Sequence, residues 1–182
     1  MEKAIGLIEL NSISKGILTM DEMVKAASVE ILEAHPVCPG KYIIIISGKV
    51  EAVKSSVKHA KETAAENLVD ELIIPNIHHD VFFALTATSN ITELKALGII
   101  ETFTAASAII AGDSAVKSSS VKLIEIRLSN GMGGKSFLTL TGDIGSVNSA
   151  IDTALDILKD EGVIVGTSVI ASPHKEISKF IL

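Results

Sequence analysis

The residues with the clearest chemical potential lie in one short segment, HPVCPGKY, residues 35–42. Cys38 is the only cysteine in the chain of 182 residues, and it stands among Pro36, Pro39 and Gly40. These prolines and the glycine predict a turn between strands, and turns run over the surface of a protein. The alternative is a small buried hydrophobic side chain, which is the usual place of a free cysteine.

A surface thiol in this loop would be a candidate metal ligand. One thiolate holds an iron–sulfur cluster poorly, because such clusters take about four ligands. A three-fold axis through the loop would bring three copies of Cys38 together. Cys38 could therefore form a cluster site only in an assembly of several chains.

A second segment, NGMGGKS at residues 130–136, has the glycines of a phosphate-binding loop. The Walker pattern needs a glycine five residues before Gly134, where this chain has Ser129, and a dinucleotide fingerprint needs a glycine in place of Ser136. Both patterns also need a helix directly after the loop, whereas residues 137–141 have the composition of a strand. The segment is interpreted as a flexible loop between strands.

The histidines are the remaining candidates for chemistry. A zinc site needs convergent ligands, and the adjacent residues His78 and His79 are expected to point in different directions. No Ser-His-Asp, Cys-His or paired-carboxylate pattern can be recognised, so we expect no enzyme. Surface or capping roles are predicted for all five: His35, His59, His78, His79 and His174.

The elements that position these residues occur twice. Residues 5–9, IGLIE, return as LGIIE at 97–101, a spacing of 92 residues. With small insertions the order continues through Asp21 and Asp113, Lys25 and Lys117, Gly40 and Gly134, Lys41 and Lys135, Gly48 and Gly142, and His78 and His174. Met132 takes the place of Cys38. The sequence therefore predicts two copies of one domain, over residues 1–90 and 95–182.

Each copy alternates strands and helices, which predicts two α/β units, each an α+β sandwich. In the first copy we expect a helix over 20–31 with Thr19 as N-cap, because Asp21 and Glu22 would lie in its first turn. The four isoleucines of 41–47 predict a strand buried on both faces. The other expected elements are strands at 4–10 and 72–74, a helix at 50–67 and a short helix from Asp80. The second copy is expected to have strands around 99 and at 121–128, 136–141 and 163–170, with a helix at 147–160.

Composition excludes several functions. Hydrophobic residues make up 47% of the chain and aromatic residues only 3%, so the core must be aliphatic. The formal net charge of −6 provides no basic stripe for nucleic acid. No apolar run is long enough to span a membrane, and the N-terminus lacks the features of a signal peptide. A single cysteine agrees with a reducing compartment such as the cytosol.

The repeated motifs resemble a known family. Gly6-Leu7-Ile8-Glu9, Asp21-x-x-Val24-Lys25-Ala26-Ala27, Gly40-Lys41-Tyr42 and Gly48-Lys49-Val50-x-Ala52-Val53 look like the bacterial microcompartment shell-protein domain. Over nearly the whole chain the sequence is most similar to the tandem-domain, T-type shell proteins, in particular those of propanediol-utilisation compartments. The resemblance implies a ferredoxin-like variety of the α/β fold, and a homotrimer that mimics a hexamer and tiles a shell in the cytoplasm.

The resemblance also implies roles for single residues. The loop between the second and third strands of each domain lines the central pore, and T-type relatives hold a [4Fe-4S] cluster there through one cysteine per subunit. Carried over, Cys38 is the cluster ligand of each subunit, and Lys25 and Lys117 lie at the tile edge. The other implied pore-loop residues are Val37, Pro39, Gly40, Gly131, Met132, Gly133 and Gly134.

Partners follow from the same resemblance: further copies of the chain, other shell proteins, and either a redox enzyme of the lumen or a cytosolic electron carrier. Shell proteins often carry an arginine shortly before the histidine near the end of each domain, where this chain has Asn76 and Ser172. Edge contacts are therefore expected to be weaker or to depend on other shell proteins. Two alternatives remain: a purely structural tile with a metabolite pore lined by Cys38, and a small-molecule sensor without a shell.

Overall fold

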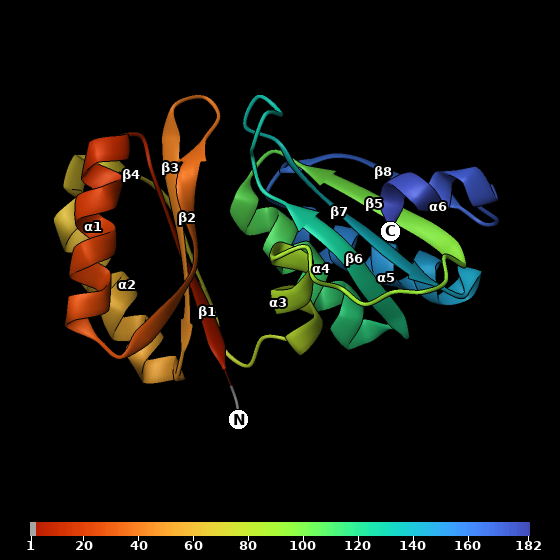
Figure 1. Cartoon of the computed structure of the whole chain (residues 1–182), viewed down its shortest axis with the longest axis horizontal. Helices are drawn as coiled ribbons and strands as arrows, with labels where there is room; N and C mark the ends of the chain where they lie inside the picture. The colour runs from red at the N-terminus through yellow and green to blue at the C-terminus, as the bar shows by residue number, and fades with distance from the viewer. Residues whose placement is uncertain (1–2) are drawn as a thin grey trace. The chain divides into compact units, whose positions relative to one another are not determined.

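The computed structural model describes residues 3–182 and divides the chain into two compact units, one ending at Ile77 and the next beginning at His78. Each unit contains one four-stranded antiparallel sheet and covering helices (Figure 1). Each is an α/β sandwich, which confirms the predicted fold class. Within residues 3–182, no helix is both long and apolar enough to cross a membrane.

The first unit has its sheet in the order β2-β3-β1-β4. Helices α1 and α2 pack against each other and cover one face of this sheet (Figure 1). In chain order the elements are β1 (Ala4–Leu10), α1 (Ile13–Ala26), β2 (Val29–Val37), β3 (Lys41–Gly48), α2 (Val50–Ala64), the 3₁₀ turn η1 (Ala65–Asn67) and β4 (Leu68–Ile74).

The second unit repeats this topology in the order β6-β7-β5-β8, with one helix before the repeat and one after it. Its elements are α3 (His79–Leu85), β5 (Ala96–Thr102), α4 (Ala105–Ser118), β6 (Val121–Arg127), β7 (Ser136–Gly142), α5 (Ile144–Leu158), β8 (Ile164–Ile170) and α6 (Lys175–Ile181).

The duplication extends to strand register. Ala4 pairs with Gly48 in the first unit, and their repeat counterparts Ala96 and Gly142 pair in the second. The irregularity in β1 after Glu9 recurs after Glu101 in β5. Shared irregularities of this kind confirm that the two units are copies of one domain.

The core is aliphatic, as the composition predicts. The isoleucine run Ile43–Ile46 in β3 is fully buried, and so is Ile8 in the neighbouring strand β1. Helix α2 contributes Val53 and Val57 to the same core. A strand whose successive side chains are all buried must be covered on both faces, which confirms the prediction for this segment.

A glycine in the first strand of each copy allows a helix to lie close to the sheet. A Cβ atom on Gly6 would stand 2.8 Å from side-chain carbons of both Val53 and Val57 in α2. A Cβ atom on the equivalent Gly98 would meet Leu140 at 2.8 Å and Val147 at 2.9 Å. The glycine in the IGLIE and LGIIE motifs is therefore required because a larger residue would not fit between the sheet and the helix that covers it.

The first helix differs from its prediction. It begins at Ile13 rather than residue 20, because Ser12 caps it by accepting a hydrogen bond from Lys15 N at 3.3 Å. Thr104 caps the equivalent helix α4 in the same way. Thr19, the predicted cap, is buried in the middle of α1. The residues after 28 belong to β2, a strand that the sequence did not separate from the helix.

Other boundaries shift by less. Strand β4 begins at Leu68, before the expected 72, and α2 ends at Ala64, with the remainder of the expected helix forming η1. Strands β6, β7 and β8 and helix α5 lie where the sequence places them, within a few residues.

Helix α3 belongs to the first repeat in sequence but packs on the second repeat in the structure. It packs on β6 and α4 and so belongs to the second unit. The backbone N–H of His78 donates a hydrogen bond of 2.8 Å to Asp113 Oδ1 in α4. The structure therefore divides the chain after Ile77, before the boundary at 90 expected from the repeat.

The glycine packing yields a stability test. Substitution Gly98→Ala is expected to lower the free energy of unfolding by about 1–3 kcal/mol, because the added methyl group overpacks a filled core. Gly166→Ala is the matched control in the adjacent strand β8, since its Cβ atom would meet nothing within 4 Å; its effect is expected within about 0.5 kcal/mol. Urea denaturation at equal protein concentration measures both. Equal effects for the two variants would contradict the close-approach argument.

Candidate functional site: the Cys38 hairpin

Cys38 lies at the tip of the hairpin between β2 and β3. Val37 and Lys41 are the last paired residues of the two strands, and Gly40 N donates a 3.0 Å hydrogen bond to Val37 O across the turn. Gly40 has φ +81°, a conformation that favours glycine. The predicted turn between strands is confirmed, although Pro36 lies within β2, opposite Tyr42.

The thiol at this tip is free and partly exposed. Val37 beneath it is buried and anchors the turn to the core, whereas a Cβ atom on Gly40 would meet nothing within 4 Å. The Cys38–Pro39 peptide bond is cis. Cys38 is therefore carried on a short, well-anchored turn with open space beside it, and a single chain supplies this one thiol only.

The equivalent loop of the second unit is longer and has a different shape. Gly131, Gly133 and Gly134 all have positive φ, and Ser129 Oγ donates a 2.9 Å hydrogen bond to Gly134 O. Met132, the counterpart of Cys38, lies within this loop and is partly buried. Strand β7 follows directly, with no helix to hold a phosphate. These features agree with a strand-to-strand loop rather than a nucleotide site.

An ion pair that the sequence motifs alone do not specify holds the base of each loop. Lys41 Nζ lies 3.0 Å from Glu9 Oε1, and the Glu9 side chain is only 4% exposed. The repeat counterparts Lys135 and Glu101 pair at 3.1 Å, but there both side chains are more than 40% exposed. The sequence does contain a signal for this pair: Glu9 and Lys41 recur together as Glu101 and Lys135 in the second copy. Residues that recur together in a duplicated domain are candidates for contact.

Two titratable residues on β2 lie along the approach to the hairpin. Burial raises the pKa of Glu33 and lowers the pKa of His35. Both shifts favour the neutral form of the side chain.

The two predicted edge lysines lie on helices, away from the loops. Lys25 in α1 forms ion pairs with Asp21 and Glu22. The hydrogen bond to Asp21 and its negative charge raise the pKa of Lys25. In α4, Lys117 Nζ lies 2.6 Å from Asp113 Oδ2. The same pair thus recurs in both copies, and contact with a neighbouring tile stays a prediction.

Two of the histidines cap helices and two, His59 and His79, lie on the surface, as expected, whereas His35 on β2 is partly buried. Ring Nδ1 of His78 accepts a hydrogen bond from Asp80 N, and ring Nδ1 of His174 accepts one from Glu176 N, both at 3.3 Å. His59 lies 3.4 Å from Glu22 on the helical side of the first unit.

Comparisons with known proteins identify the family. The BMC domain model matches residues 4–77 and again residues 96–173. The chain is 38% identical over 175 residues to the bacterial microcompartment shell protein PduT of Citrobacter freundii, a match that covers 96% of this chain and 95% of that protein. The chain belongs to the bacterial microcompartment shell-protein family.

Solved structures agree with this assignment. The crystal structure of a microcompartment protein from Desulfitobacterium hafniense superposes with a TM-score of 0.95 at 49% identity, over 98% of this chain and 99% of that one. A fused, permuted hexameric shell protein of the RMM microcompartment shares the fold, with a TM-score of 0.64 at 22% identity over 87% and 84% of the two chains. The family and fold implied by the motifs are thus confirmed, as is a structural rather than an enzymatic role.

The Glu9–Lys41 pair yields a second test. Substitution Lys41→Met is expected to lower the free energy of unfolding by about 2–4 kcal/mol, because it leaves a buried carboxylate without its partner. Lys135→Met is the matched change in the second unit and is expected to cost less than about 1 kcal/mol, because that pair is exposed to solvent. Urea unfolding at pH 7 compares them. A cost for Lys135→Met equal to that for Lys41→Met would overturn the assignment of Lys41 as the anchor of the hairpin.

Proposed function

We propose that this shell protein forms a homotrimeric tile that carries one [4Fe-4S] cluster at its central pore, bound by Cys38 from each of three subunits. The cluster would transfer electrons across the shell or maintain a redox centre inside it. The observation that carries this proposal is a free, partly exposed thiol at the tip of an anchored hairpin, with open space beside it.

The donor chemistry supports a cluster only in an assembly. Iron–sulfur clusters are held by thiolates, usually four. Three Cys38 side chains around an axis would leave one iron without a cysteine ligand, and such an iron suits exchange with water or a partner. The cluster would supply one-electron redox chemistry. This chain would contribute the ligands, through hairpins anchored by Val37 and the Glu9–Lys41 pair.

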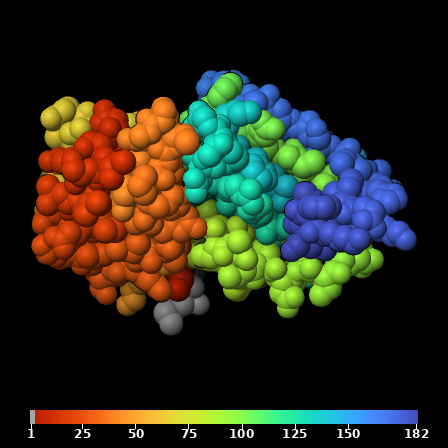
Figure 2. All heavy atoms as spheres, turned by 45° about the horizontal axis from the view of Figure 1, so that its top comes forward, coloured from red at the N-terminus to blue at the C-terminus, as the bar shows by residue number. Residues whose placement is uncertain are grey.

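The terminal helices support head-to-tail assembly. Helix α3 ends the first repeat and is seated on β6 and α4, with Val81, Ala84 and Leu85 buried. Helix α6 ends the second repeat, starts with the same histidine cap and has no buried residue. Phe180, the counterpart of Ala84, is 86% exposed, and the end of the chain lies on the surface of its unit (dark blue in Figure 2). Helix α6 therefore lacks the packing surface that its counterpart α3 has on β6 and α4.

The complementary surface lies on α1. Ile17 is 50% exposed, whereas its counterpart Ile109 in α4 is fully buried. Asp21 is largely exposed, whereas its counterpart Asp113 is buried and accepts the hydrogen bond from His78 N. We infer that α6 of one subunit packs on α1 and β2 of the next, with His174 N donating to Asp21. Heterologous interfaces form a ring when the rotation between successive subunits closes and an open filament when it does not, and the family resemblance supports a closed ring of three chains.

The remaining parts of the proposal concern partners. The relatives are named as shell proteins of bacterial microcompartments, which supports a place for this chain among other shell proteins, in a compartment of the propanediol-utilisation type. A redox enzyme of the lumen or a cytosolic electron carrier would exchange electrons with the cluster. Lys25 and Lys117 would lie at the outer edge of the tile.

Metal analysis tests the cluster. Protein purified without oxygen and reconstituted with iron and sulfide is expected to hold about four irons and four sulfides per trimer. Cys38→Ser is expected to be colourless but still trimeric, because a thiol at a hairpin tip contributes little to the core. Met132→Ser is the matched control in the second unit and is expected to keep the cluster. A wild-type trimer that binds no iron would contradict the redox role and favour a metabolite pore lined by Cys38.

Native mass spectrometry tests the interface. Phe180→Glu and Asp21→Ala are each expected to shift the protein from trimers to monomers, because they remove the apolar anchor and the hydrogen-bond acceptor of the same contact. Ile157→Glu is the control: Ile157 is 51% exposed on α5 and its counterpart in α2 is the polar Thr63, so it is expected to leave the trimer intact. Trimers that survive Phe180→Glu, or a monomeric wild type, would contradict this interface.

A further inference from the structure

A group of metal-ligating side chains lies outside the Cys38 hairpin, where α3 begins. His78, His79 and Asp80 each offer one ligand atom, and these atoms lie within 4.8 Å of one another. His79 Nε2 is 2.9 Å from Asp80 Oδ1, and His78 Nδ1 is 3.8 Å from the same oxygen. The two imidazole rings are 4.5 Å apart between centroids.

This arrangement corrects the expectation that the adjacent histidines point in different directions. His78 is the N-cap of α3 and has an extended backbone, φ −65° and ψ 140°. Its ring turns back over the first helical turn to accept the hydrogen bond from Asp80 N. The cap therefore places the first histidine beside the second and beside the aspartate.

We propose that His78, His79 and Asp80 bind one divalent transition-metal ion, with Zn²⁺ as the preferred ion. Two imidazole nitrogens and one carboxylate oxygen form a donor set typical of zinc sites with three protein ligands. Ligand atoms about 2.0–2.2 Å from a tetrahedral zinc lie about 3.4 Å apart. The separations of 2.9 and 3.8 Å bracket this value.

The flexibility of the three side chains suits metal capture. Asp80 is 22% exposed and His78 is 31% exposed, so both are held by their surroundings, whereas His79 is 73% exposed and can rotate to complete the site. The hydrogen bond from Asp80 N to His78 Nδ1 is long, at 3.3 Å, and the metal would replace it. The ligands are side-chain atoms, and the helix start only holds them in place.

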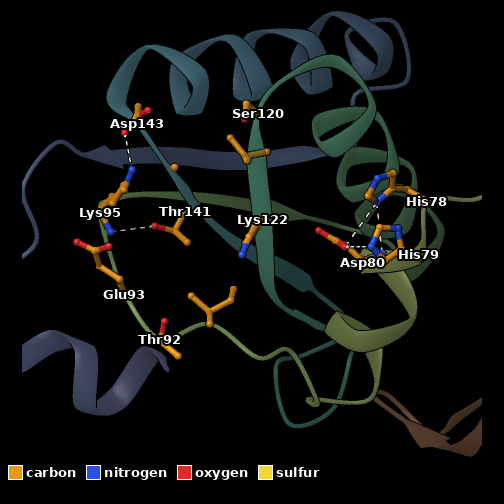
Figure 3. A pocket seen from close by; sticks show the side chains of 13 residues that line it. His78, His79, Asp80, Thr92, Glu93, Lys95, Ser120, Lys122, Thr141 and Asp143 are labelled. Atoms are coloured by element: carbon orange, nitrogen blue, oxygen red, sulfur yellow. Dashed lines mark hydrogen bonds and ion pairs between the residues drawn. The ribbon is translucent and has the colours of Figure 1, made fainter.

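The surroundings leave room for a further ligand. The three residues form one wall of a cavity of about 530 Å³ in the second unit, and Lys122 extends into this cavity (Figure 3). A zinc ion with three protein ligands keeps one position for water or a small anion, and the ammonium group of Lys122 would attract an anion there.

A second cavity that the group lines also contains an unsatisfied polar atom. His79 and Asp80 also line an adjoining cavity of about 240 Å³ with Ser89. Among residues 3–182, Ser89 Oγ is one of four buried side-chain polar atoms without a hydrogen-bond partner. A buried hydroxyl group normally has a hydrogen-bond partner. A water molecule bound to the metal would supply this partner for Ser89.

The second repeat provides an internal control. His174 caps α6 with the same geometry, and Glu176 takes the place of Asp80. Lys175 stands where the first repeat has His79. Because lysine at neutral pH donates hydrogen bonds and has no free lone pair for a metal, the second helix start lacks one of the three ligands.

Titration of the full chain with Zn²⁺, and with Co²⁺ followed by its visible absorption, tests the proposal. The protein carries no histidine tag and has Cys38→Ser as its background, so that a thiolate cannot bind the metal and the result does not depend on the proposed cluster. We expect one metal ion per chain, with Co²⁺ bands typical of four-coordinate geometry. His79→Lys, which copies the second repeat, and Asp80→Asn are each expected to weaken binding at least ten-fold. His174→Ala is expected to leave binding unchanged.

These measurements distinguish a metal site at the start of α3 from its absence. Circular dichroism confirms that the variants fold, and His79→Lys changes a largely exposed side chain. Loss of binding in His79→Lys and Asp80→Asn but not in His174→Ala supports the site. The absence of one bound ion per chain in the unsubstituted background would overturn it. Binding that survives both first-repeat substitutions, or that falls equally in His174→Ala, would also overturn it.

Discussion

The hydrogen bond from His78 N to Asp113 Oδ1 marks the junction on which the rest of the organisation depends. It joins the end of the first repeat to the first helix of the second, and α3 buries its apolar side chains there. In this duplicated domain, the terminal helix of the first copy, α3, packs on the second copy. The same arrangement leaves two surfaces without a packing partner in one chain: the terminal helix α6 and the first helix α1. The exposed side chains Phe180 and Ile17 lie on these two surfaces, and their exposure is the observation behind the proposed head-to-tail assembly.

Assembly in turn decides what Cys38 can do. In one chain it is a solitary thiol on a turn, and a solitary thiolate is a poor ligand set for a cluster. The turn is nevertheless well supported, because Val37 is buried beneath it and Lys41 is paired with the buried carboxylate of Glu9. The second repeat keeps the lysine and the glutamate but has a longer loop with Met132. The two copies have therefore diverged at the loop tip while they retained the anchoring residues.

Much of this fold could be predicted from the sequence, because its signals are local. Four successive isoleucines predict a doubly covered strand, and the strand pattern of the second copy follows from β-branched and aliphatic runs. The predicted start of α1 is wrong because Ser12 and Thr19 are both chemically suitable caps, and the sequence does not choose between them. In addition, Ile13 and Ile17 in the first turns of the helix are exposed, so these turns lack the buried apolar pattern by which a helix is recognised. The place of α3 and the Glu9–Lys41 pair depend on tertiary packing. The convergence of His78 and His79 depends on a backbone conformation at a helix start, which the residue types alone do not specify.

The central claim is that three chains build one redox site that no single chain contains. Native mass spectrometry of anaerobically purified, reconstituted protein measures chain number and cluster content in one spectrum. The expected result is a trimer that carries the additional mass of one [4Fe-4S] cluster, which is lost in Cys38→Ser while the trimer remains. A cluster-free wild-type trimer, or a cluster retained in Cys38→Ser, would contradict the account.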